Sequence, residues 1–252
     1  MCFDTDALPP DPARTGLGAG SERSTLTADD GTRFATTFAR TGEPSPAGIV
    51  IIPDVRGLHP YYERLAEHVA DAGIHALAID PYGRTAGAEH RDEGFDYQDH
   101  RGRVRDAGVR ADVRAAAAAL REAGAAVVVS LGFCAGGRMS LMQASQDAID
   151  GVIAFYGPPA RGEDGGSSPL EEARAGLVRA PVLGLYGGDD RSIPSEDLEA
   201  YERALEEAEI TNRIVVYPGA PHSFFDRSMS EHAEESRDAW ARVLGFVDTL
   251  AR

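Results

Sequence analysis

Short apolar runs alternate with amphipathic stretches along nearly the whole chain. The runs have the length and β-branched content of buried strands, and the stretches repeat apolar residues at helical spacing. We expect strands at residues 48–53, 74–80, 125–131, 149–157, 180–187 and 212–219, and helices at 61–73, 109–124, 137–145, 195–209 and 230–250. This alternation predicts an α/β fold with a mostly parallel central sheet and helices on both faces.

The N-terminal region departs from this pattern. Residues 1–23 are rich in Pro, Gly, Asp and Ser and are expected to form an irregular arm. Residues 24–40 predict a β-hairpin, in which Asp30-Gly31 is a type I′ turn signal. We find no internal repeat and no second domain, and 252 residues are enough for one substantial core. We therefore expect an arm over 1–23 and a single α/β domain over 24–252.

The charge balance narrows the choice of partners. The chain has 41 acidic and 25 basic residues, a formal net charge of −16, and every basic residue is an arginine. Such a surface repels phosphate backbones, which disfavours nucleic-acid binding. The absence of lysine fits either GC-rich coding or a salt-adapted surface, and composition does not decide between them.

The cysteines and the apolar runs indicate the cellular compartment in which the protein is expected. Of the two cysteines, Cys2 lies in the expected arm, so a structural disulfide with Cys134 is not expected. The first residues lack the basic and apolar regions of a signal peptide, and no apolar run reaches membrane-spanning length. We expect a cytoplasmic monomer or weak homo-oligomer without a membrane partner.

The stretch "LGFCAGG" around Cys134 has the form G-x-C-x-G-G between an expected strand and an expected helix. This is the nucleophile-elbow pattern with sulfur in place of oxygen. Gly132 and Gly136 would remove side chains that clash in so tight a turn, and the following helix would place its N-terminus at the sulfur. A buried structural cysteine at a glycine-rich turn is the alternative that this motif alone leaves open.

Candidate partners for the thiol follow two later strands. "GGDDRSIP" places Asp189 and Asp190 after the strand at 180–187, and "APHSFF" places His222 after the strand at 212–219. The order nucleophile, acid, histidine is that of α/β-hydrolases. The other histidines suit surface or half-buried roles, although His90 and His100 lie in a long charged loop over residues 81–101 and could touch substrate. No paired His or Cys spacing suggests zinc, so neither a metal nor a cofactor is expected.

Five stretches together resemble the dienelactone hydrolase family, which are cysteine-dependent hydrolases of the α/β-hydrolase fold that open enol-lactones. They are "IIPDVRGL", "AIDPYGR", "GFCAGG", "GGDDRSIP" and "APHSFF", and the resemblance runs from about residue 48 to the C-terminus. It implies Cys134 as nucleophile and His222 as base. Counting back from Pro194, it implies Asp190 rather than Asp189 as the acid.

The resemblance also implies roles around this triad. The backbone N–H groups of Val55 and Ala135 would form the oxyanion hole, and Arg84 would hold a substrate carboxylate. Asp54 stands where the family commonly has a glutamate that modulates the thiol, so it either takes over that role or braces Arg56. Asp226 stands where a second basic residue is expected in the family, and Arg227 follows it.

These residues predict a hydrolase that opens a lactone or cleaves an activated ester through a thioester, with a carboxylated, dienelactone-type substrate favoured. A thiol forms a thioester readily but expels an amine poorly, which favours esters over amides. A general carboxylesterase for neutral esters is the alternative within enzymes. A thiol redox sensor or a binding protein on a hydrolase scaffold is the alternative from another class.

Overall fold

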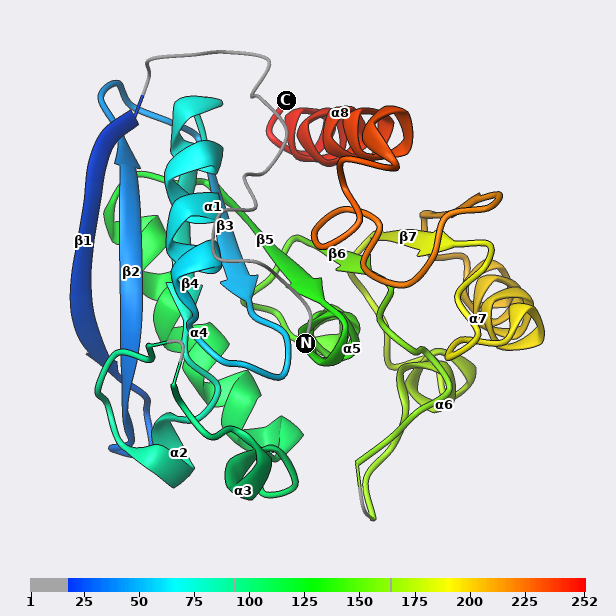
Figure 1. The fold of residues 1–252 in the computed structure, drawn as a ribbon, viewed down its shortest axis with the longest axis horizontal. Helices are drawn as coiled ribbons and strands as arrows, with labels where there is room; N and C mark the ends of the chain where they lie inside the picture. The colour runs from blue at the N-terminus through cyan, green and yellow to red at the C-terminus, as the bar shows by residue number, and fades with distance from the viewer. Residues whose placement is uncertain (1–17, 93, 164) are drawn as a thin grey trace.

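The computed structural model describes residues 18–92, 94–163 and 165–252 and has a single eight-stranded sheet with helices on both faces (Figure 1). The strand order is β1-β2-β4-β3-β5-β6-β7-β8. The first two strands pair antiparallel, and β3 to β8 run parallel to one another. The strands are β1 (Gly18–Thr27), β2 (Arg33–Thr41), β3 (Ala47–Ile52), β4 (His75–Ile79), β5 (Val127–Phe133), β6 (Gly151–Phe155), β7 (Val182–Gly187) and β8 (Asn212–Tyr217). The α/β fold predicted from the alternating pattern is confirmed.

The helices follow the strands in the order that the apolar periodicity predicts. In Figure 1, α1 lies in front of the sheet and α4 behind it. The helices are α1 (Pro60–Asp71), α2 (Gly83–Ala86), α3 (Gln98–Arg101), α4 (Asp106–Glu122), α5 (Ala135–Leu141), the 3₁₀ helix η1 (Met142–Ser145), α6 (Pro169–Arg174), α7 (Ser195–Glu207) and α8 (Ala233–Leu250).

Successive side chains of the buried strands pack alternately into two apolar cores, one on each face of the sheet. Ile49 and Ile51 of β3 point to the side covered by α1 and α8, where Trp240 packs. Val50 and Ile52 point to the opposite side, covered by α4 and α7. Because successive strand residues face opposite sides, a strand buried on both faces must be apolar throughout, as β3 is.

The hairpin turn differs from the predicted type I′ turn. Gly31 has φ +85°, whereas Asp30 is not among the residues with positive φ, and a type I′ turn requires both. The N–H of Gly31 donates to Ala28, and the N–H of Thr32 donates to the Asp30 side chain at 3.0 Å. The five residues between the strands, 28–32, are therefore held by backbone hydrogen bonds and by the Asp30 carboxylate, with Asp30 at a negative φ.

Several features lie outside the sequence predictions. Short helices α2 and α3 form within residues 81–101, where a loop was expected. The boundary expected at residue 23 falls inside β1, and residues 1–17, including Cys2, lie outside the described residues. Helix α6 was not predicted, yet Ser168 and Glu171 form a capping box at its start and Pro169 occupies its first turn. That Ser-Pro-x-Glu pattern is a helix-start signal readable from the sequence. Within the described residues, no helix is long and apolar enough to span a membrane.

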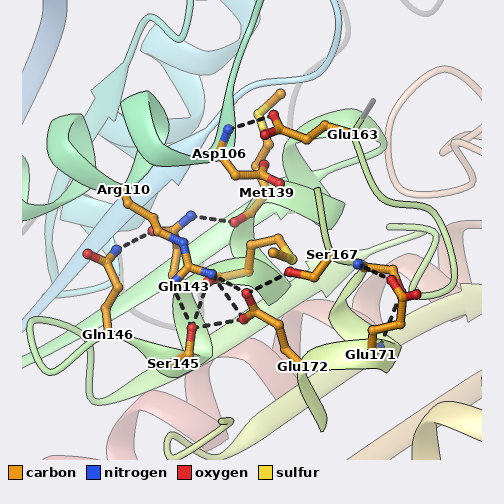
Figure 2. Close-up of polar contacts among 12 residues, drawn as sticks. Asp106, Arg110, Met139, Gln143, Ser145, Gln146, Glu163, Ser167, Glu171 and Glu172 are labelled. Atoms are coloured by element: carbon orange, nitrogen blue, oxygen red, sulfur yellow. Dashed lines mark hydrogen bonds and ion pairs between the residues drawn. The ribbon is translucent and has the colours of Figure 1, made fainter. Parts of the chain in front are cut away.

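A network of hydrogen bonds and ion pairs connects η1, which follows α5, to α4 and α6 (Figure 2). Arg110 of α4 binds both carboxylate oxygens of Glu172, at 2.7 and 2.9 Å, and the hydroxyl of Ser145 at 2.6 Å. Glu163 accepts a hydrogen bond from the N–H of Asp106, at the first residue of α4, at 2.8 Å. The network therefore joins α4, η1 and α6 on the face of the sheet opposite α1.

Candidate active site

The chain turns sharply at Cys134, between β5 and α5. Cys134 has φ +54° and ψ −115°, a conformation that costs energy for a residue other than glycine. A Cβ on Gly132 would overlap the carbonyl oxygen of Gly136, and a Cβ on Gly136 would overlap the carbonyl oxygen of Pro53. Only glycine at these two positions allows α5 to start this close to β3 and β5. The half-buried Cys134 therefore stands at the N-terminus of α5.

The acid and the histidine meet at the same edge of the sheet. Asp190 follows β7 and His222 follows β8, and these neighbouring parallel strands end at the same edge. The Asp190 Oδ2 lies 2.5 Å from the His222 Nδ1, and Ser192 donates to the Asp190 Oδ1 through its N–H and its hydroxyl. Asp189 is exposed, and within the described part of the chain its one hydrogen bond runs from its backbone N–H to the carbonyl of Ala220. The structure thus pairs His222 with Asp190.

The lowered pKa of Asp190 is consistent with its contact with His222. Burial acts to raise the pKa of Asp190, but hydrogen bonds from His222 and Ser192 outweigh it and lower the pKa below its usual value. Asp190 is therefore a carboxylate that can accept the His222 Nδ1 proton, in the tautomer whose other ring nitrogen is a proton acceptor.

The His222 ring packs against a tyrosine that sequence reasoning missed. The ring centroids of His222 and Tyr156 lie 4.8 Å apart, and Tyr156 is fully buried at the end of β6. Tyr156 has φ +39° and Ser223, next to the histidine, has φ +64°. With Cys134, they are three of the four non-glycine residues with positive φ in the described chain, the fourth being Glu209. Backbone strain is thus concentrated around the site, as is common where function fixes geometry.

The two expected oxyanion donors lie on segments that the elbow brings into contact. β3 and β5 are adjacent, with Ile52 paired to Gly132, and Gly136 packs on the carbonyls of Ile52 and Pro53. Val55 and Ala135 are both half-buried. Among the described residues, neither the N–H of Val55 nor that of Ala135 has a hydrogen-bond acceptor. Two unsatisfied donors on adjoining segments, one of them directly after Cys134, can stabilise an oxyanion.

The model of the dienelactone hydrolase family matches residues 34–251. The chain belongs to this family. A protein of Salmonella typhimurium that carries the provisional name carboxymethylenebutenolidase is 31% identical over 251 residues, covering 94% of this chain and 90% of that protein. A similarly named protein of Methylorubrum extorquens is 32% identical over 209 residues, covering 80% of this chain and 71% of that protein.

Solved structures agree with this assignment. A crystal structure from Klebsiella pneumoniae, provisionally titled a dienelactone hydrolase, has 30% identity and a TM-score of 0.78, covering 90% of this chain and 98% of that one. A dienelactone hydrolase-like promiscuous phosphotriesterase from metagenomic libraries has a TM-score of 0.74 at 23% identity, a likeness of fold. The chain is therefore an α/β-hydrolase of the dienelactone hydrolase family and a carboxylic-ester hydrolase.

Asp54, which replaces the glutamate common in the dienelactone hydrolase family, is buried and paired with Arg56. The Asp54 carboxylate accepts from the Arg56 N–H at 2.9 Å and from the Arg56 guanidinium at 3.0 to 3.2 Å. Both of its oxygens therefore have a cationic partner two residues away. Of the two roles considered for Asp54, this geometry favours the bracing of Arg56.

Arg84 takes its partners from the hairpin turn and from α4. Its guanidinium binds the buried Asp112 of α4 at 2.8 Å and the hydroxyl of Thr32 at 2.7 Å, and it also contacts Asp30 in the hairpin turn. A Cβ on Gly108 of α4 would collide with the Arg84 side chain, so the two are closely packed. The structure therefore joins α2 to α4 and the hairpin through Arg84, and does not bring Arg84 together with Cys134 and His222.

Asp226 is a second residue whose role the sequence did not reveal. It occupies the position where the family pattern predicts a basic residue, and it is 3% exposed. The Tyr156 hydroxyl donates to the Asp226 Oδ2 at 2.5 Å. Burial raises the pKa of Asp226 to about 8, although the hydrogen bond from Tyr156 acts in the opposite direction. Asp226 thus supports the tyrosine that packs on His222.

The remaining histidines have local partners. The His90 Nδ1 lies 3.2 Å from Glu63 of α1, and the His100 ring stacks on Phe95 with centroids 5.3 Å apart. Within residues 18–92, 94–163 and 165–252, no group of three or more His, Cys, Asp or Glu side chains could hold a metal ion.

Proposed function

We propose that this protein hydrolyses a lactone or an activated ester through a triad of Cys134, His222 and Asp190 and a thioester intermediate. The observation that carries the proposal is the 2.5 Å contact between Asp190 and His222, at the same sheet edge as the strained elbow that presents Cys134. The carboxylate fixes the imidazole tautomer, and the helix N-terminus stabilises the thiolate.

The reaction follows from these roles. His222 takes the thiol proton, and the Cys134 sulfur attacks the carbonyl carbon, so that the carbonyl electrons move to an oxyanion held by the Val55 and Ala135 N–H groups. Collapse of this intermediate breaks the ester C–O bond, and His222 protonates the departing oxygen. A water molecule then gives a proton to His222 and attacks the thioester. Breaking of the C–S bond then releases the acid, and His222 returns the proton to the Cys134 sulfur.

A carboxylated, dienelactone-type substrate is one candidate, and it would need a cation at the site. The contacts of Arg84 favour the second candidate, a carboxylesterase that accepts neutral esters, because Asp112 and Asp30 already neutralise that guanidinium. Comparing kcat/KM for a carboxylated dienelactone, a neutral lactone and p-nitrophenyl acetate separates the two. A loss in Arg84→Ala confined to the carboxylated substrate would support the first candidate, and equal losses would support the second.

The decisive test of the nucleophile uses p-nitrophenyl acetate and intact-protein mass spectrometry. Cys134→Ala should lose turnover and acetylation while keeping the thermal unfolding temperature of the parent. Cys134→Ser should also be poor, since an alcohol needs stronger base assistance than a thiol. Retained hydrolysis by Cys134→Ala would refute the triad. A thiol that reacts faster with peroxide than with the ester would favour the redox-sensor alternative.

A further inference from the structure

The oxyanion donor Val55 lies in a turn whose peptide units are held from several directions. The N–H of Gly57 donates to the carbonyl of Asp54 at 3.2 Å, and Gly57 has φ +73°. The Asp54 carbonyl and the Val55 N–H belong to one planar trans peptide, so they point in opposite directions. The bond to Gly57 therefore directs the Val55 N–H away from the turn.

Two tyrosines from different elements hold the peptide units on either side. The hydroxyl of Tyr62, on α1, accepts from the Asp54 N–H at 3.1 Å. The hydroxyl of Tyr82, after β4, donates to the Val55 carbonyl at 2.5 Å. With the peptides on both sides held, the peptide that carries the Val55 N–H can turn only about the ψ of Asp54 and the φ of Val55. Such a turn would break the hydrogen bond from the Gly57 N–H to the Asp54 carbonyl.

Tyr82 is itself held in place by the long loop over residues 81–101. Its side chain is 2% exposed, and a Cβ on Gly57 would come within 2.8 Å of its ring. The rings of Phe95 and His100 lie 5.6 and 6.1 Å from the Tyr82 ring. Burial raises the pKa of Tyr82, so the hydroxyl keeps its proton and remains a donor.

We propose that Tyr82 is a positioning residue of the oxyanion hole, which holds the Val55 N–H toward the reacting carbonyl by donating to the Val55 carbonyl. This inference rests on the proposed function, in which Val55 stabilises the oxyanion. Tyr82 acts through the backbone of Val55 and does not touch the substrate. Phe95 and His100 of the long loop pack on the Tyr82 ring and so help to hold Tyr82 against the Val55 carbonyl.

The test compares Tyr82→Phe with a matched control. Tyr82→Phe keeps the ring and removes the donor, so kcat for p-nitrophenyl acetate should fall on the order of 10-fold while KM stays close to the parent value. Tyr201→Phe is the control, because Tyr201 is a fully buried tyrosine of α7 whose hydroxyl has no hydrogen-bond partner among the described residues. Its kcat should be that of the parent.

A pair of thiol reagents distinguishes positioning from a general effect on the fold. A trifluoromethyl ketone adds the Cys134 sulfur to its carbonyl carbon and creates an oxyanion, so it should bind Tyr82→Phe about 10-fold more weakly. Iodoacetamide alkylates the same sulfur with loss of iodide and creates no oxyanion, so its rate should not change. Parallel losses with both reagents would overturn the proposal, because they would indicate a disturbed thiol.

The failure of this inference can be told apart from the failure of the proposed function. If Cys134→Ala is inactive but Tyr82→Phe has the kcat and ketone affinity of the parent, only the role of Tyr82 is wrong. If Cys134→Ala keeps its activity, the proposed function is wrong. Should Tyr82→Phe fold poorly, Tyr62→Phe gives the same test, because it removes the contact on the other side of Val55 and should also weaken the ketone selectively.

Discussion

At the scale of single residues, the partner of each polar side chain decides its chemistry. Asp189 and Asp190 are adjacent in the sequence, yet one is exposed and the other is buried against His222. Asp54 and Arg84 likewise carry charges that their neighbours neutralise, Arg56 in one case and Asp112 in the other. The chemical role of a charged residue therefore depends on the group that it contacts.

The neighbouring aspartates give a matched pair of variants. Asp190→Asn should lower kcat/KM for p-nitrophenyl acetate by a factor on the order of 10³–10⁴, because the amide stabilises the wrong imidazole tautomer. Asp189→Asn should leave kcat/KM near the parent value, since its side chain is exposed. The opposite order, measured on variants with unchanged thermal unfolding, would assign the acid to Asp189.

At the scale of elements, α5 must be held against β3 and β5 for the elbow to exist. Arg138 of α5 binds both carboxylate oxygens of Asp106 in α4, at 2.6 and 3.0 Å, and both side chains are about nine-tenths buried. Such a pair stabilises little compared with an apolar pair of the same shape, but removal of one partner leaves an uncompensated buried charge.

A double-mutant cycle tests this link between the helices. Arg138→Met should lower the free energy of unfolding by about 3–5 kcal/mol, because the Asp106 carboxylate remains buried without its cation. The double variant Arg138→Met/Asp106→Leu should recover much of that loss. Urea unfolding measures both, and additive losses in the double variant would mean that the two side chains are not coupled.

At the scale of the whole molecule, the burial of one carboxyl makes stability depend on pH. Burial raises the pKa of Asp226 to about 8. In the unfolded chain this group loses its proton near pH 4. Between about pH 4 and pH 8 the folded protein therefore binds more protons than the unfolded chain at this position, and the contribution of Asp226 to stability falls as pH rises.

Asp226→Asn should remove this pH-dependent contribution. For one such group the slope is at most about 1.4 kcal/mol per pH unit. The stability of the variant relative to the parent should therefore rise as pH increases from about 5 to about 8. Urea unfolding at several pH values measures this difference. A difference that is constant with pH would show that Asp226 is ionised throughout, and Glu231→Gln, at an exposed position, should give no such slope.

The sequence by itself determined the α/β fold, the order of the predicted strands and the glycine-rich elbow at Cys134. These features depend on local patterns: apolar periodicity, β-branched runs, and glycines where a Cβ would overlap backbone atoms. The placement of Asp190 and His222 after two successive strands was also readable, because parallel neighbours end at one edge of the sheet. The helix α6 was missed even though its capping box was present in the sequence.

Only the tertiary structure decided which long-range partners the polar side chains take. Arg84 binds Asp112, 28 positions away, and Tyr156 binds Asp226, 70 positions away. The hydroxyl of Tyr82 reaches Val55 across 27 positions. No local pattern marks these pairs, because they form when the packing of β-strands and helices brings distant segments together and excludes water from them. Burial then sets which groups keep their protons, as at Asp226, and that burial is a property of the assembled fold.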